Sequence, residues 1–240
     1  MTTTTPRPRV GPLVWPLAGV AAQLAELGLL AVSSGLTVAG WLIGGGYGLV
    51  TAALLIGALR RSQRRTVGPA DVVTLLRSTL VGSVAALAAD SLAGAPDRYV
   101  LITSTAVVAL ALDAVDGVVA RSTNTASPLG ARFDMEVDAS LLAVLSIYLV
   151  PSAGLWVVAI GGMRYAFVVA GWLLPWLRGP LKPTRLGKTV AAMQGIVLIA
   201  ACSRVFPAWA TTTMVAAALA LLVFSFGRDI VRLWRARPPG

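Results

Sequence analysis

Long apolar runs, separated by short polar loops, constrain the fold of this 240-residue chain more than any other sequence feature. Most of these runs are long enough to cross a bilayer core as helices, and unpaired strands cannot do so. Hydrophobic residues make up 57% of the chain and charged residues 12%, too little polar surface for a water-soluble globule. We therefore predict an all-α integral membrane protein with eight spans, at about 13–32, 36–59, 70–93, 99–120, 133–150, 154–175, 189–205 and 208–227.

The positive charges give an independent prediction of orientation. Of the 20 Lys and Arg residues, Arg98 and Arg204 fall on one side of the predicted spans and Arg164 falls inside one, which leaves 17 on the other side. By the positive-inside rule that side is the cytoplasm. We expect a multi-pass protein of the plasma membrane, with both termini on the cytoplasmic side.

Two alternatives concern the basic character of the chain. The net charge of +10 could indicate nucleic-acid binding, but the charges are scattered over loops without aromatic residues between them. Contact with anionic lipid headgroups explains them better, so we expect the lipid bilayer and no nucleic acid as partner. The first run, which follows Arg7 and Arg9, could also be a cleaved signal peptide; its apolar region is ill-defined and no clear cleavage site stands out, so we expect it to be retained.

The residues that the chain lacks narrow its chemistry. Histidine is absent and Cys202 is the single cysteine, which excludes imidazole bases, intrachain disulfides and Cys-rich metal sites. Carboxylates are the remaining groups for acid–base or metal chemistry.

Four of the ten acidic residues are spaced for convergence. Asp113 and Asp116 lie three residues apart near the end of the fourth run, and Asp134 and Asp138 lie four apart near the start of the fifth, so each pair shares a helix face. A short loop joins the two helices, and four acids so close would repel each other unless neutralised. Oxygen ligands suit Mg²⁺ or Mn²⁺, so we predict two divalent ions; the alternative is pairing of the acids with Arg121 and Arg132.

Small and basic residues accompany the acids. Gly117 follows Asp116, and Gly130 lies four residues before Asp134; both would let a phosphate approach the backbone closely. Arg121 is placed to neutralise a diphosphate. The region therefore favours a metal-dependent reaction at phosphorus.

The pattern Asp113-x-x-Asp116-Gly117-x-x-Ala120-Arg121, then eight residues, then Gly130-x-x-x-Asp134-x-x-x-Asp138, matches every fixed position of the signature of the CDP-alcohol phosphotransferases. The resemblance implies a six-helix core at 67–240 that includes a basic C-terminal tail. It leaves 1–66 as an N-terminal tail with two additional transmembrane helices. The stretch from Asp71 to Arg77 is similar to the Asn-x-x-Thr-x-x-Arg element of this family, with Asp71 in place of Asn.

The resemblance also implies roles for the residues. The family transfers a substituted phosphate from a CDP-linked donor, usually CDP-diacylglycerol, to an alcohol and releases CMP, and its members are commonly homodimers. Asp138 would contact a metal and act as general base. The implied metal ligands are Asp113, Asp116, Asp134 and Asp138. The implied CDP site consists of Asp113, Asp116, Gly117, Ala120, Arg121, Gly130 and Asp134.

The acceptor alcohol stays open. The loop from Leu181 to Thr189, with Gln194, resembles a stretch of phosphatidylglycerophosphate and cardiolipin synthases, although a basic cytoplasmic loop explains it equally well. The sequence from Asp134 to Ala139 lacks the Pro and Lys that those synthases carry. Spare cations suit an acceptor phosphate, as in inositol phosphate or glycerol 3-phosphate. The candidate acceptor-binding residues are Arg164, Lys182, Arg185 and Lys188.

Two other classes of function are alternatives. A divalent-cation transporter would use the acids as its ion site, but the outer half of the predicted spans offers only Asp90 and Asp97. An inactive relative retained as a scaffold is the second, and the intact signature argues against it.

Overall fold

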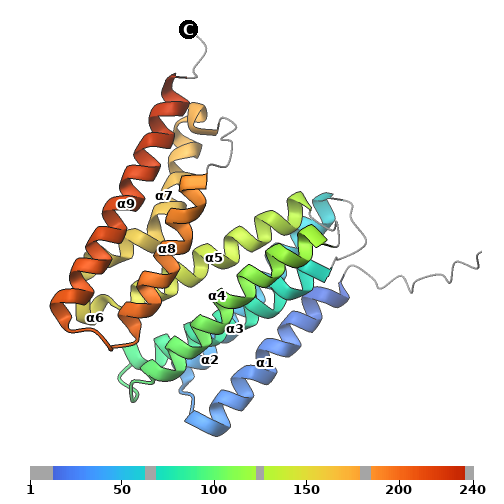
Figure 1. The fold of residues 1–240 in the computed structure, drawn as a ribbon. Coiled ribbons are helices and arrows are strands. Elements are labelled where there is room, and N and C mark those ends of the chain that lie inside the picture. The colour runs from blue at the N-terminus through green and yellow to red at the C-terminus, as the bar shows by residue number, and fades with distance from the viewer. Residues whose placement is uncertain (1–12, 63–68, 123–126, 179–184, 236–240) are drawn as a thin grey trace, which may run out of the picture. The chain divides into compact units, whose positions relative to one another are not determined.

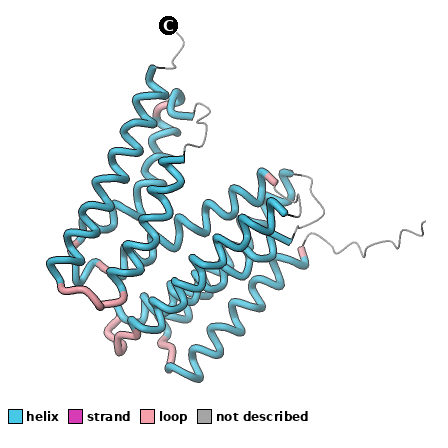
Figure 2. Tube along the Cα trace, in the orientation of Figure 1, coloured by secondary structure: helices cyan, strands magenta, loops and turns pink. Residues whose placement is uncertain are grey.

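The structure, a computed structural model, describes residues 13–62, 69–122, 127–178 and 185–235. Its described residues are helices and short connections without strands (Figure 2). One long helix corresponds to each predicted run. The helices are α1 (Val14–Ser34), α2 (Val38–Ser62), α3 (Pro69–Leu92), α4 (Tyr99–Ser122), α5 (Pro128–Tyr148), α6 (Val150–Ala153), η1 (Leu155–Val157), α7 (Val158–Leu173), η2 (Pro175–Arg178), α8 (Arg185–Cys202) and α9 (Ala208–Arg235) (Figure 1).

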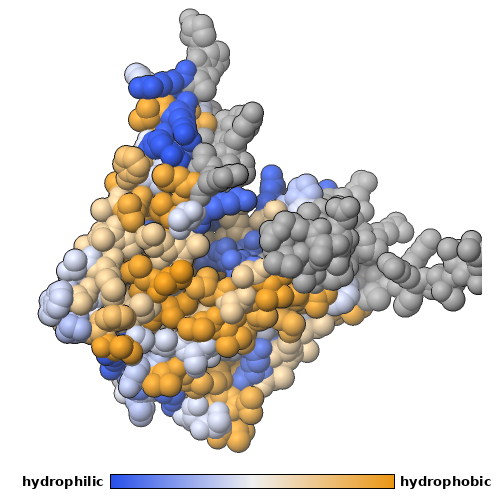
Figure 3. Space-filling view, in the orientation of Figure 1, coloured by the Kyte–Doolittle hydropathy of each residue, from blue (hydrophilic) through white to orange (hydrophobic). Residues whose placement is uncertain are grey.

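The prediction of an all-α membrane protein is confirmed. Among the described residues, five helices are long and apolar enough to cross a membrane, within α1, α2, α3, η1–α7 and α9. Shorter apolar helices lie in α4 and α8. Helix α5 falls outside both groups because Arg132, Asp134, Glu136 and Asp138 interrupt its first half. In Figure 3 hydrophobic residues cover most of the visible face, and hydrophilic residues gather at the C-terminal end of α9.

Some boundaries differ from the prediction. Helix α5 begins at Pro128 rather than at 133, because Ser127 caps a helix start that precedes the apolar run. Helix α9 runs to Arg235 rather than to 227 and takes the basic tail into the helix. The predicted span at 154–175 begins with a break at Gly154, whose φ of 95° favours glycine, and its helix α7 starts at Val158.

The chain divides into two compact units, one of residues 1–96 and 108–137 and the other of residues 97–107 and 138–240. In the first unit α1, α2 and α3 pack against one another (Figure 1). Helix α3 is the most buried of the three: 67% of its most apolar 18-residue stretch is buried, against 17% for α1 and 22% for α2. Small residues along α3, such as Gly82, Ala85 and Ala86, allow this close packing.

In the second unit α8 packs against α9, and the buried Gln194 of α8 donates a hydrogen bond of 2.8 Å to the Ala218 carbonyl of α9. Phe167 and Phe226 meet edge to face between α7 and α9. A Cβ on Gly161 of α7 would collide with the backbone at Ala143 of α5, so glycine is needed at this crossing.

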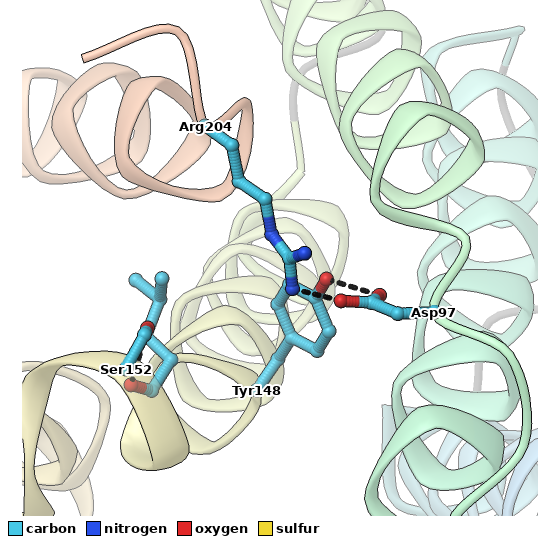
Figure 4. A network of polar contacts seen from close by, with 5 residues as sticks. Asp97, Tyr148, Ser152 and Arg204 are labelled. Atoms are coloured by element: carbon cyan, nitrogen blue, oxygen red, sulfur yellow. Dashed lines mark hydrogen bonds and ion pairs between the residues drawn. The ribbon is translucent and has the colours of Figure 1, made fainter. Parts of the chain in front are cut away.

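A polar cluster ties three segments of this second unit together (Figure 4). Asp97, just before α4, accepts a 2.6 Å hydrogen bond from the Tyr148 hydroxyl of α5. It also forms an ion pair with Arg204, which lies in the α8–α9 connection. The Arg204 guanidinium also lies over the Tyr99 ring, 5.0 Å from its centroid. Arg204, which the charge count placed opposite the cytoplasmic side, is therefore the partner of Asp97, an acid of the outer half.

Candidate metal centre

Two helices position the acidic residues of the signature. Asp113 lies in the second half of α4, and Asp134 and Asp138 lie one turn apart in the first half of α5. Each of these three residues offers a carboxylate oxygen, and the three oxygens lie within 4.8 Å of one another. All three residues are half-buried. The boundary between the compact units falls between Val137 and Asp138, but α5 is continuous there, so its helical geometry places Asp138 beside Asp134.

Other signature residues are placed only in part. Asp116, Gly117, Ala120 and Arg121 belong to α4, but their side chains lie outside the described residues. The structure therefore brings together three of the four predicted metal ligands, and the fourth, Asp116, stays a prediction.

Arg77 of α3 contacts two of the acids. Its Nη1 lies 3.0 Å from Oδ1 of Asp113 and 2.5 Å from Oδ1 of Asp134, while its side chain is only 1% exposed. A charge this deeply buried needs such partners. The guanidinium neutralises part of the acidic cluster, and the same charge opposes a divalent cation held by these carboxylates.

Sequence reasoning assigned no role to Arg77 and considered Arg121 and Arg132 as the counter-ions. Two signals were available: Arg77 matches the Arg of the Asn-x-x-Thr-x-x-Arg element, and it lies just inside the third apolar run, where an arginine usually faces the bundle interior. Arg132 is exposed on α5, and the side chain of Arg121 is not described.

Gly130 has a packing reason that the sequence did not reveal. Ser127 precedes α5, and its hydroxyl accepts a 2.9 Å hydrogen bond from the Gly130 N–H, a typical N-cap contact. A Cβ on Gly130 would lie 3.1 Å from Ser127 Oγ and would collide with the Asp71 carboxylate of α3. Glycine therefore lets the start of α5 approach the start of α3, which places Asp71 next to the signature.

The candidate acceptor residues do not form a described cluster. Arg164 is half-buried in α7, and Lys188 is exposed in the first turns of α8. Arg185 begins α8, but its side chain is not described, and Lys182 lies outside the described residues. Gln194 of the similar stretch ties α8 to α9, which gives it a structural role.

The residues present fit a hard divalent cation. Three carboxylates converge without a soft sulfur or imidazole ligand, which is the donor set of Mg²⁺, Mn²⁺ or Ca²⁺. An acidic cluster with oxygen donors for a divalent ion therefore lies beside the buried Arg77, where Gly130 permits α5 to approach α3.

The family comparison agrees with this class of site. The family model for CDP-alcohol phosphatidyltransferase matches residues 68–225, and the chain belongs to this family. The resemblance predicted from the signature is thereby confirmed. No curated protein and no solved structure matches the chain. The family is one of transferases, and the multiple apolar helices make the chain a multi-pass membrane protein.

Proposed function

We propose that this protein transfers a phosphatidyl group from CDP-diacylglycerol to a small polar alcohol and releases CMP, in phospholipid biosynthesis. The observation that carries the proposal is the convergence of Asp113, Asp134 and Asp138 on two helices that belong to the family match. Inositol phosphate and glycerol 3-phosphate are the favoured acceptors, because spare cations suit an acceptor phosphate.

The residues of the acidic cluster divide the work. Asp113, Asp116, Asp134 and Asp138 hold two divalent ions, Mg²⁺ or Mn²⁺. Bound ions supply charge stabilisation at the phosphate oxygens and at the leaving CMP. Asp138 also accepts the proton of the acceptor hydroxyl, which makes that oxygen a better nucleophile towards the phosphorus of the donor.

The CDP moiety binds beside these acids. Gly117 and Gly130 let the diphosphate approach the helix backbones, and Ala120 leaves room on the same helix as Asp116. Arg121 binds the diphosphate oxygens.

The acceptor side is proposed from charge. Arg164, Lys182, Arg185 and Lys188 are the candidate ligands of an acceptor phosphate. We further propose a plasma-membrane location with the site open to the cytoplasm and both termini on that side, and a homodimeric assembly, as expected for the family.

The contacts of the outer acids, Asp90 and Asp97, argue against the transporter alternative. Asp90 accepts hydrogen bonds from the Thr37 N–H and hydroxyl and from the Gly40 N–H. Asp97 is bound by Tyr148 and Arg204. Acids held by such contacts stabilise helix packing and do not form an ion path.

The testing experiment measures CMP release by the purified protein in nanodiscs, with CDP-diacylglycerol, Mg²⁺ or Mn²⁺, and a panel of acceptors. The panel contains inositol, inositol phosphate, glycerol 3-phosphate, serine and phosphatidylglycerol. Acceptor-dependent release supports the proposal and names the acceptor. Absence of both CMP release and CDP-diacylglycerol binding contradicts it.

A further inference from the structure

The α1–α2 hairpin, residues 14–62, precedes the family match and takes no part in the proposed chemistry. It packs along α3, the helix that carries Arg77. The contacts between hairpin and α3 are polar at several depths, which is costly in a membrane unless the groups are paired.

One contact joins the middle of α1 to α3. Glu26 accepts hydrogen bonds of 2.8 Å from the hydroxyls of Thr79 and Ser83, one on each carboxylate oxygen. One turn away on α1, Gln23 is 1% exposed and lies against Gly82 of α3, where a Cβ would come within 2.9 Å of its Nε2. The side chain of Gln23 thus occupies the space that this glycine leaves.

A second set of contacts joins α2 to α3. The fully buried Asp90, near the end of α3, accepts hydrogen bonds from the Gly40 N–H at 2.8 Å and the Thr37 N–H at 3.0 Å, so it caps the start of α2. Further along α2, a Cβ on Gly44 would lie 2.8 Å from Ala86 Cβ. The hairpin therefore fixes both the rotation and the depth of α3.

The hairpin and Arg77 lie on opposite faces of α3. A helix turns about 100° per residue, so Thr79, Gly82, Ala86 and Asp90 fall on one stripe. Arg77 lies about 160° from Thr79 by the same geometry, and its guanidinium reaches Asp113 and Asp134. The hairpin thus contacts the face of α3 opposite to Arg77.

We propose that the α1–α2 hairpin is a positioning element for the metal centre: its Glu26 and Asp90 contacts hold α3 so that Arg77 stays between Asp113 and Asp134. The inference rests on the proposed function, because it assigns the hairpin a role towards the same acidic cluster. Loss of the Glu26 contact lets Arg77 withdraw from the acids, which removes a charge that opposes a divalent ion.

The test compares Glu26→Leu and Glu26→Gln with a control, Ser33→Ala, because within the described residues the Ser33 hydroxyl contacts the Leu29 carbonyl of its own helix and neighbouring Ser34. Mn²⁺ affinity is measured by electron paramagnetic resonance in nanodiscs, without substrate, and thermal unfolding is followed in parallel. Thr79 has a second acceptor in the Leu76 carbonyl, so we expect Glu26→Leu to fold. Its Mn²⁺ binding should tighten at least about threefold, with Glu26→Gln in between and the control unchanged.

A double variant separates positioning from general destabilisation. In an Arg77→Met background, Glu26→Leu should leave the Mn²⁺ affinity unchanged, while its effect on thermal unfolding persists. Unchanged or weakened Mn²⁺ binding in Glu26→Leu overturns the inference, and so does a shift that survives in the double variant. If the wild-type protein itself binds no Mn²⁺, the proposed metal centre fails and the inference fails with it; Mn²⁺ binding without a Glu26 effect refutes the inference alone.

Discussion

Replacement of Arg77 by methionine should tighten divalent-metal binding, although it removes a side chain that contacts two of the proposed ligands. The three carboxylate oxygens lie within 4.8 Å of one another. For a guanidinium charge and a divalent ion assumed to be about as far apart, the repulsion is about 1.7 kcal/mol in water. Bulk water gives the smallest value of this repulsion, because Arg77 is 1% exposed although Asp113 and Asp134 are 36% and 34% exposed. Without Arg77 the repulsion between two carboxylates, about 0.9 kcal/mol, acts against site formation. The difference is about 0.8 kcal/mol, or roughly fourfold tighter binding.

The assay is a Mn²⁺ titration followed by electron paramagnetic resonance, at neutral pH and low ionic strength. Arg60→Met is the matched control, since Arg60 is exposed at the end of α2 and its loss changes the net charge equally. The control should bind Mn²⁺ like the wild type. Weaker Mn²⁺ binding by Arg77→Met would refute the electrostatic reasoning and would indicate that Arg77 organises the ligands.

Three further predictions concern packing. Gly130→Ala should lower both the thermal unfolding temperature and CMP release, because the added methyl group collides with the Asp71 carboxylate; unchanged values would contradict the close approach of α5 to α3. Asp90→Leu should cost about 2 kcal/mol or more in a denaturation series, because it removes the buried cap of α2, and wild-type stability would contradict that role. Tyr148→Phe should cost about 1 kcal/mol through the lost bond to Asp97 and leave CMP release unchanged; loss of activity would place Tyr148 in the reaction.

Helix positions were predictable from the sequence, because long apolar runs leave few alternatives in a bilayer. The helix boundaries were less predictable: α5 starts at Pro128, where Pro128, Gly130 and Arg132 interrupt the apolar pattern. The break at Gly154 depends on a single backbone conformation, which hydropathy does not report. The division of the chain at residues 66 and 67 stays a prediction.

The acidic cluster was predictable because helical spacing dictates which residues share a face. Asp113, Asp134 and Asp138 converge as the spacing indicated. The contact of Arg77 with these acids was not predictable, because it joins α3 to two helices that lie much later in the sequence. The hydrogen bonds of Glu26 with Ser83 and of Asp90 with Thr37 were not predictable for the same reason, because their partners lie more than 50 residues apart in the sequence.

The packing of the glycine-rich stretch of α2 was predictable only in general terms. Gly44 and Gly48 meet neighbours within the chain, at Ala86 and Gln23 respectively. Gly45 and Gly46 have open space beside them in the part of the chain that the structure describes. Alternation of this kind follows from which face of α2 meets α1 and α3, and the sequence alone does not specify it.

CMP release by the Asp138→Ala variant shows whether the acids of α4 and α5 catalyse the proposed phosphatidyl transfer. Glu136→Ala is the matched control, because Glu136 lies on the same helix, two residues away and on another face. With CDP-diacylglycerol, Mg²⁺ and an accepted alcohol, wild type and Glu136→Ala should release CMP, and Asp138→Ala should be slower by about 10³-fold. CMP release by Asp138→Ala at the wild-type rate would contradict the account.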